Sequence, residues 1–292
     1  MTDSAPRTGF TVPPPPTGPD PLTGAPGDGF GGWASRTVAV CRRSMLPGVL
    51  LLGGATVVPA AAGAVLAVAM FDVVGSAGPN EPPQLPPWLF PGFLALYVVA
   101  GYLYAAGFAA TLRMMARDAY GLPRDFGATV RFGLRRAVPL CLWYVVAGVL
   151  IMLGFFLCVL PAYYVEIVTA MIAPIVVFER SHALRRTFRL MHRDFWPSVA
   201  KVLLTTLVAG AFSMVGAMVI EIPVFVSGVL GIRDGATGLH LDPVVTLVTS
   251  VVGMLLLAPG TVVVAAGLLT GYAELRAGEA GVTGADLVDA AT

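Results

Sequence analysis

One glutamate, Glu166, lies inside a long apolar stretch of the sequence, and another, Glu221, lies just past the end of such a stretch. An ionisable side chain in such a stretch is costly and often marks the pathway of a proton or a cation. Both glutamates stand near the stretch ends that we assign to the outer face, where a carboxylate can reach water. We therefore expect them to be rim residues, and a transport pathway through them is the alternative.

A run of arginines offers a second kind of chemistry, the binding of anions. It lies within ERSHALRRTFRLMHRDFW, residues 179–196. Basic side chains at the cytoplasmic leaflet each contribute on the order of 1 kcal/mol to attraction by anionic headgroups. The alternative is that these charges only orient the protein in the membrane. The residues predicted to contact anionic lipid or a protein partner are Arg185, Arg186, Arg189 and Arg193, with Arg131 and Arg135 from an earlier segment.

Patterns typical of metal binding or catalysis are missing from the sequence. The histidines and cysteines form neither HExxH nor CxxC, and neither GxxxxGK[ST] nor GxSxG occurs on a cytoplasmic loop. We therefore expect no metal, no cofactor and no enzymatic activity. The residues concerned are His182, His192, His240, Cys41, Cys141 and Cys158.

The composition excludes a soluble enzyme. Of the 292 residues, 57% are hydrophobic and only 12% are charged, whereas about 25% are charged in an ordinary soluble domain. The net charge of +1 gives no reason to expect nucleic acid as a partner.

Six apolar stretches are long enough to cross about 30 Å of hydrocarbon, which takes about 20 helical residues. The predicted fold class is therefore an all-α membrane protein with six transmembrane helices. Pro161 separates the third stretch from the fourth and predicts a tight helical hairpin there. The stretches run approximately over residues 45–74, 88–112, 137–160, 162–178, 197–220 and 244–270.

The distribution of charge predicts the orientation. With six spans and an inside N-terminus, all of the 18 basic residues except Arg233 fall on one side. Because positive charge concentrates in cytoplasmic loops, both termini should lie in the cytoplasm, with the protein in the plasma membrane. A model with five spans would place one arginine-rich loop on the opposite face.

Three segments share one pattern, an amphipathic stretch with arginines on one side, followed by a proline. They are Trp33–Pro47, Phe126–Pro139 and Ala183–Pro197. In the third, apolar residues recur at helical spacing and predict a helix lying in the membrane interface. We therefore expect three hairpins, each preceded by an interfacial helix. The apolar residues of that third segment are Leu184, Phe188, Met191 and Phe195.

Composition also divides the chain into three regions. Residues 1–30 are rich in proline and predict a disordered cytoplasmic tail. Residues 31–275 form the predicted six-helix transmembrane domain, and residues 276–292 a short cytoplasmic C-terminal tail. Near the end of the sixth stretch, Gly267 and Gly271 form a GxxxG pattern, which favours packing of helices within the chain.

Two adjoining segments carry a resemblance to known proteins, VLPAYYVEIVTAMIAPIVVFER (Val159–Arg180) and ALRRTFRLMHRDFWPSVAKVLL (Ala183–Leu204). The region from about residue 121 to 210 resembles uncharacterised integral membrane proteins of high-GC Gram-positive bacteria. These are similar to the membrane domain attached to some glycerophosphoryl diester phosphodiesterases. The resemblance implies a multi-pass plasma-membrane protein with six helices, and it carries over no catalytic residue.

These observations predict a non-enzymatic membrane protein, a scaffold or accessory subunit with a basic cytoplasmic belt. The alternative is a small transporter or permease subunit. A transporter should show a hydrated path with Glu166 or Glu221 pointing into it. A scaffold should show a closed bundle with these acids at its outer rim.

Overall fold

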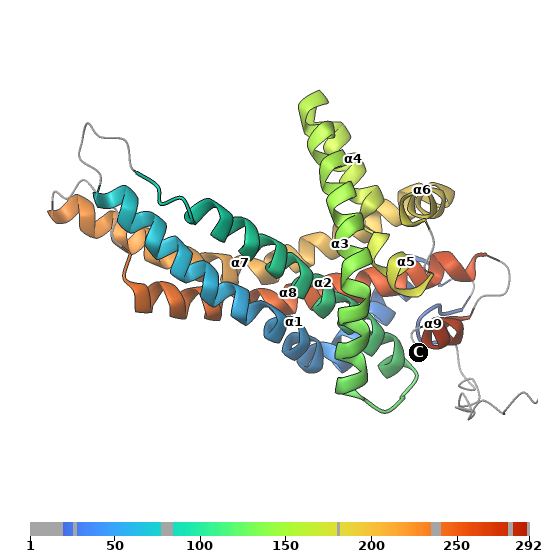
Figure 1. Ribbon diagram of the computed structural model, residues 1–292. Coiled ribbons are helices and arrows are strands. Elements are labelled where there is room, and N and C mark those ends of the chain that lie inside the picture. The colour runs from blue at the N-terminus through green and yellow to red at the C-terminus, as the bar shows by residue number, and fades with distance from the viewer. Residues whose placement is uncertain are drawn as a thin grey trace, which may run out of the picture.

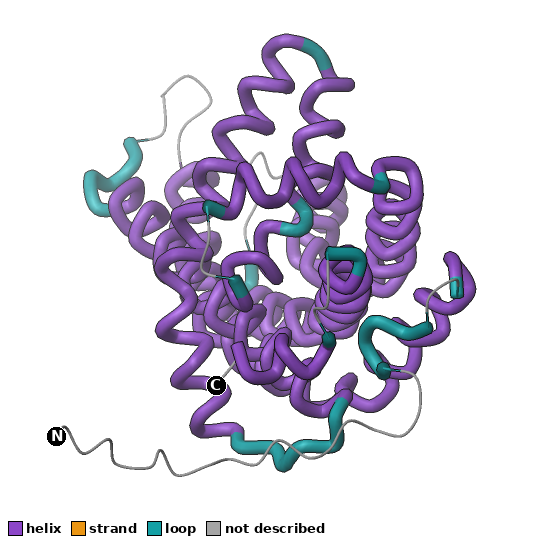
Figure 2. Tube along the Cα trace, turned by 90° about the vertical axis from the view of Figure 1, so that its right-hand side faces the viewer, coloured by secondary structure: helices purple, strands orange, loops and turns teal. Residues whose placement is uncertain are grey.

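Nearly every described residue of the computed structural model belongs to a helix (Figures 1 and 2). The structure describes residues 20–25, 28–76, 84–179, 182–234, 241–279 and 283–290, with the side chains of 230–234 and 289–290 left out, and no strand occurs in these ranges. Six helical segments are long and apolar enough to cross a membrane, in agreement with the predicted number. The helices are α1 (Gly29–Ser76), α2 (Leu89–Ala119), α3 (Phe126–Leu157), α4 (Val159–Thr169), α5 (Ile172–Phe178), α6 (Ala183–Arg193), α7 (Phe195–Asp234), α8 (Pro243–Ala277) and α9 (Gly284–Ala290).

Local chemistry explains several helix ends. Asp125 caps α3 by accepting a hydrogen bond from the Ala128 N–H at 2.9 Å, and Asp242 caps α8 in the same way. The turn between α3 and α4 falls at Cys158, whose backbone is extended. Pro161 lies in the first turn of α4, where a missing N–H has no consequence, so the hairpin turns three residues earlier than predicted.

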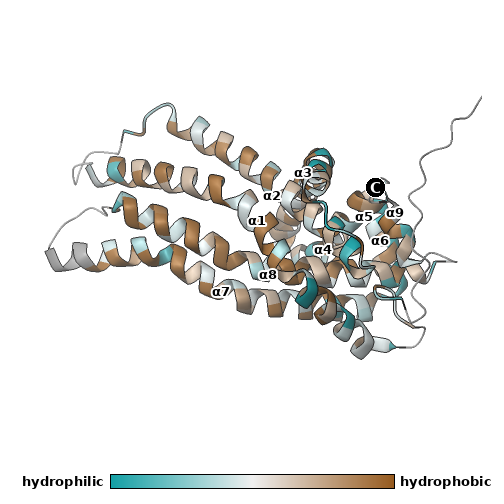
Figure 3. Cartoon of the chain, turned by 90° about the horizontal axis from the view of Figure 1, so that it is seen from below, coloured by the Kyte–Doolittle hydropathy of each residue, from teal (hydrophilic) through white to brown (hydrophobic). Residues whose placement is uncertain are grey.

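Helices α1, α2, α7 and α8 lie side by side as a bundle (Figures 1 and 3). Glycines bring α7 and α8 close together. A Cβ on Gly260 would lie 2.7 Å from the carbonyl oxygen of Ala209, and one on Gly216 would lie 2.6 Å from that of Gly253. At the same contact between α7 and α8, a Cβ on Gly267 would run into the side chain of Thr205. The predicted small-residue packing within the chain therefore includes Gly267, as is common where apolar helices associate.

Helices α3 and α4 cross this bundle steeply instead of lying along it (Figures 1 and 3). The crossing point is marked by Gly133, where a Cβ would run into the backbone of Ala106 on α2. A Cβ on Gly154 of α3 would lie 2.8 Å from the backbone nitrogen of Ala162 on α4, so these two helices form their own hairpin. Consecutive spans lie side by side as the pairs α1–α2, α3–α4 and α7–α8. The first and third pairs make up the four-helix bundle, and the second pair crosses it (Figure 1).

Two of the three predicted interfacial helices are not separate elements. The segment Trp33–Pro47 forms the first turns of α1, and Phe126–Pro139 forms the first half of α3. Both segments pack against other helices: the Thr37 hydroxyl of α1 lies 2.7 Å from that of Thr270 on α8, and Gly133 of α3 lies against Ala106 of α2. Only the third segment contains a helix of its own, α6.

The two ends of the described chain meet at one end of the bundle, the charged end. Asp20 accepts hydrogen bonds at 2.9 Å from the Tyr120 hydroxyl, after α2, and from the Gly284 N–H at the start of α9. Leu22 is fully buried, so the last part of the predicted tail is packed; residues 1–19 lie outside the described ranges. Colouring by hydropathy shows that the apolar parts of the bundle helices extend away from this end (Figure 3).

The bundle is longer than a bilayer is thick. Helix α1 has 48 residues, about 72 Å at the usual rise, against about 30 Å of hydrocarbon. The first turns of α1 and the last turns of α2 and α8 carry the charged side chains. If the bundle crosses a bilayer, these turns extend beyond its hydrocarbon core at the charged end.

Candidate functional site: the arginine-bearing end

Helix α6 presents exposed arginines beside the charged end of the bundle. Arg185, Arg189 and Arg193 are exposed, as are Arg131 and Arg135 in the first half of α3. Within the described part of the chain, none of these five side chains makes a hydrogen bond or an ion pair. Their guanidinium donors are therefore available to an external anion.

The apolar face of α6 packs partly against the protein, and its predicted place in the membrane interface stays a prediction. Met191 is fully buried, and Phe188 and Phe195 pack partly buried against the core. The rings of both phenylalanines lie near Tyr164 of α4, with centroids 6.5 and 6.2 Å away. The Tyr164 hydroxyl also lies 2.7 Å from His192 Nε2. The α6 helix is therefore anchored to α4 by an aromatic cluster.

Arg186 differs from the other predicted contact residues because its charge is used within the chain. Its Nε donates to Glu179 Oε2 at 2.7 Å, and its Nη2 pairs with Glu279. Arg276 lies 3.4 Å from the same Glu179, which also accepts a hydrogen bond from the Tyr272 hydroxyl at 2.8 Å. The hydrogen bond from Arg186 lowers the pKa of Glu279, although partial burial opposes this shift.

A second acid joins three helices of the bundle. Glu274 of α8 lies 2.9 Å from Lys201 Nζ of α7 and 3.6 Å from Arg36 Nη2 of α1. Arg36 also pairs with Asp28 at 2.8 Å. These pairs are partly buried, so loss of one partner would leave a poorly solvated charge.

A third acid holds α2 to α1 and to the following loop. Asp118 is buried and accepts hydrogen bonds from Ser44 Oγ at 2.8 Å and from Arg124 Nε at 3.0 Å. Arg43 donates to the carbonyl oxygen of Asp118 at 3.0 Å. Nearby, burial opposes ionisation of Asp20, but hydrogen bonds from Thr23 and other donors outweigh it and lower its pKa.

The two predicted transport acids do not line the large apolar cavity. Glu166 on α4 and Glu221 on α7 are both exposed. Neither lines the large cavity of the described chain, although Ile220 beside Glu221 does. The structure therefore places neither carboxylate in the lining of this cavity.

Metal-ligating side chains do not gather within the described ranges, where no group of three or more histidines, cysteines or acids could hold an ion. Cys41 and Cys141 are half-buried, whereas Cys158 is exposed at the α3–α4 turn. His182 is exposed and not part of any such group, and His240 lies outside the described residues.

The acids of the charged end are functional candidates that sequence reasoning missed. Glu179, Glu274 and Glu279 each follow or end an apolar stretch, at the side where arginines are frequent. That position is a signal for ion pairing with some arginine. It does not identify the partner, because the pairing residues are far apart in the chain: Arg186 pairs with Glu279, and Arg36 near the N-terminus pairs with Glu274.

Comparison with known proteins adds no relative: no family model, curated protein or solved structure matches this chain.

Proposed function

We propose that this chain is a non-enzymatic, multi-pass protein of the plasma membrane, a scaffold or accessory subunit whose arginines contact anionic lipid headgroups. The observation that supports the proposal is that its basic residues fall into two groups, those that form ion pairs within the chain and those that do not. Arg36, Arg186 and Lys201 form ion pairs within the chain, whereas the exposed arginines of α6 and α3 form none among the described residues, and only Arg193 is attracted at longer range by an acid, Glu279. We name these five the arginine surface: Arg131, Arg135, Arg185, Arg189 and Arg193.

The proposed orientation places the charged end and both termini in the cytoplasm. The hydrogen bond between Asp20 and the Gly284 N–H supports a common side for the two ends of the described chain. The concentration of arginines at that end supports the cytoplasmic assignment, through the bias of positive charge in membrane proteins. This class agrees with the resemblance of Ala183–Leu204 to uncharacterised bacterial membrane proteins.

A small transporter or permease subunit is less well supported. A coupled transporter usually needs ionisable or polar groups near the midplane, along a water-filled path. The exposed positions of Glu166 and Glu221, away from the cavity lining, provide no such path.

Lipid binding by the full-length protein tests the proposal. We expect detergent-solubilised protein to bind a fluorescent phosphatidylglycerol about a hundredfold more tightly than a variant with Arg185→Gln, Arg189→Gln and Arg193→Gln. The binding should weaken in high salt, because exposed charges are screened.

The matched control replaces the same three arginines by lysine. This variant keeps the charge and the orientation signal, so it should retain most of the affinity. Equal binding of phosphatidylglycerol and phosphatidylcholine, or an unchanged affinity of the glutamine variant, would contradict the binding of anionic lipid by these arginines. An acidic protein partner would then be their ligand.

A further inference from the structure

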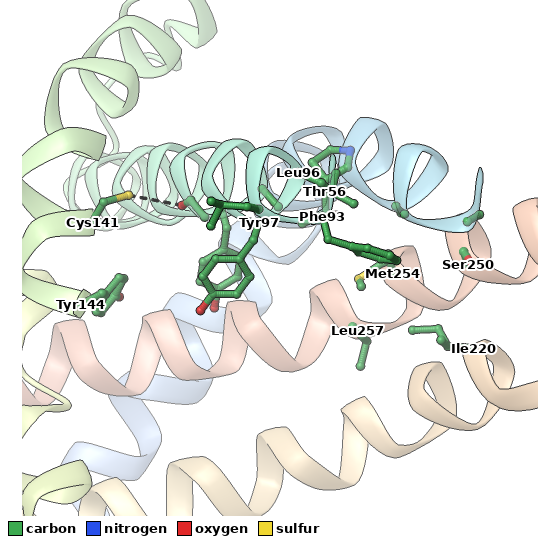
Figure 4. Close-up of a pocket in the computed structure, with 18 of the residues that line it drawn as sticks. Thr56, Phe93, Leu96, Tyr97, Cys141, Tyr144, Ile220, Ser250, Met254 and Leu257 are labelled. Carbon is green, nitrogen blue, oxygen red and sulfur yellow. Dashed lines mark hydrogen bonds between the residues drawn. The ribbon is translucent and has the colours of Figure 1, made fainter. Parts of the chain in front are cut away.

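A large groove lies between the apolar parts of the bundle helices. Its volume is about 1340 Å³, larger than the roughly 300–1,000 Å³ of sites for drug-sized ligands. Side chains of α1, α2, α3 and α8 line it, with Ile220 from α7. In Figure 4, Cys141 and Tyr144 extend from α3 at one end of the groove, and Phe93 and Tyr97 come from α2.

Small residues form the floor of the groove, and the rim is exposed. Ala60 and Ala64 of α1 and Ala258 of α8 line it and are nearly fully buried. On the rim, Tyr97 is 80% and Met152 62% exposed. The groove therefore opens sideways between α2 and α3, toward the surroundings of the bundle.

Two glycines show that the space is not filled by the chain itself. Gly101 of α2 and Gly148 of α3 both line the groove, and a Cβ on either would meet no atom within 4 Å. Protein interiors seldom contain voids larger than a water molecule. At the depth of the hydrocarbon, the material available to fill an apolar space of this size is lipid.

The lining excludes a charged ligand. It contains no aspartate, glutamate, lysine, arginine or histidine, and burial of an unpaired ion in such surroundings is strongly unfavourable. Its polar groups are mainly hydroxyls, including those of Tyr97, Tyr104 and Tyr144. Tyr104 lies about 14 Å along α2 from Arg113, well inside the apolar part of the helix.

We propose that this groove binds an uncharged lipid, its hydrocarbon chains along the alanine floor and its polar group beside Tyr104 and Tyr144. A lipid of this class, such as a diacylglycerol, can bring its head to that depth because no charge has to be buried. Tyrosine hydroxyls can donate hydrogen bonds to its ester or hydroxyl oxygens. The inference goes beyond the proposed function, because the groove does not involve the arginine surface.

Photocrosslinking of the full-length protein in phosphatidylcholine nanodiscs tests this site. The probe is a diacylglycerol with a diazirine on one acyl chain, and the comparison probe is phosphatidic acid with the same chains. We expect the diacylglycerol to label groove residues such as Phe93 and Met254 about tenfold more than phosphatidic acid does. Equal labelling by the two probes would overturn the preference for an uncharged lipid.

A groove-filling variant supplies the specific control. Gly101→Leu with Gly148→Leu places two side chains in the open space and should reduce diacylglycerol labelling about tenfold, because they displace lipid methylenes. Gly210→Leu, at an exposed α7 position with nothing within 4 Å, should leave the labelling unchanged. Undiminished labelling of the filled variant, at wild-type thermal stability, would contradict the site.

A second variant keeps the test valid if the filled protein does not fold. Tyr104→Phe with Tyr144→Phe removes the two hydroxyls at constant shape. It should reduce labelling by diacylglycerol but not by a simple alkyl diazirine, which has no polar head. Equal loss or no loss with both probes would show that the hydroxyls do not select the ligand. Neither variant alters the arginine surface, so failure here is distinguishable from failure of the proposed function.

Discussion

At the scale of single residues, the charged end depends on acids that serve several partners at once. Glu179 is contacted by Arg186, Arg276 and Tyr272, and Glu274 by Arg36 and Lys201. Each acid joins elements that are distant in sequence. Such shared pairs are worth more than isolated surface pairs, because several side chains are already ordered and partly desolvated.

Glu279 makes the stability of this end dependent on pH. Its pKa is lowered in the folded protein from the ordinary value of 4.5, mainly by the hydrogen bond from Arg186. The folded state therefore binds fewer protons than the unfolded chain in that range. Its contribution is complete above the unfolded pKa and is lost as the pH falls through the folded pKa.

We expect Glu279→Gln to lower the thermal unfolding temperature at pH 7. The difference in unfolding temperature between this variant and wild type should become smaller as the pH falls below 4.5. Circular dichroism of the protein in detergent measures this. Glu166→Gln is the matched control, since the Glu166 side chain makes no hydrogen bond or ion pair among the described residues. A constant difference between Glu279→Gln and wild type over this pH range would contradict the assigned role.

At the scale of elements, the apolar stretches of the sequence predict where the helices lie in the chain, but not which face of a helix contacts lipid and which contacts another helix. An apolar face with helical spacing shows that one side of a helix avoids water. It does not distinguish lipid from another helix. Segment Trp33–Pro47 therefore reads as an interfacial helix, although Thr37 and Thr270 place its face against α8.

Proline was an equally ambiguous signal. Pro47 and Pro139 each precede an apolar stretch, as a proline in the first turn of a new helix does, but both lie inside continuous helices, α1 and α3. Neighbouring helices tolerate such prolines in apolar surroundings. Pro197 does lie in the first turn of α7, directly after the break at Asp194. The apolar groove between the helices could not be predicted from the sequence either, because it depends on the distances between packed helices.

The contact between α7 and α8 gives a prediction at this scale. Gly260→Ala should destabilise the protein by about 1–3 kcal/mol, because the new Cβ must displace a backbone carbonyl. Gly210→Ala is the matched control on the open side of α7, where the substitution should stabilise the helix by about 0.5–1 kcal/mol. Thermal unfolding of both variants in detergent measures the two signs. An unchanged stability of Gly260→Ala would show that the two helices can separate without loss.

At the scale of the whole molecule, the α3–α4 hairpin and the bundle cannot both follow the membrane normal. Both are strongly apolar on their surfaces: Phe156 near the hairpin turn is 82% exposed, and Phe90 on α2 is 79% exposed. If the four bundle helices cross the bilayer, the hairpin runs along its plane, with an apolar tip in hydrocarbon. Either arrangement leaves the two ends of the described chain on one side, because the hairpin returns to the side from which it starts.

The exposed Cys158 at the hairpin turn distinguishes the two arrangements. Six parallel spans would place this thiol at the outer face, where a membrane-impermeant maleimide added to intact cells should label it. The crossing observed here predicts that Cys158 stays in the bilayer and is not labelled. The test uses a background with Cys41→Ala and Cys141→Ala, so that Cys158 is the sole thiol.

Two further single-cysteine variants calibrate the labelling, each with Cys158→Ala. Ser76→Cys, at the end of α1 remote from the arginines, should be labelled on intact cells. Ser35→Cys, at the charged end, should be labelled only after permeabilisation, because a maleimide that does not cross the membrane cannot reach the cytoplasm. Labelling of Cys158 as strong as that of Ser76→Cys would show that the hairpin aligns with the bundle and crosses the membrane. Labelling of Ser35→Cys on intact cells would reverse the orientation and move the arginine surface to the outside.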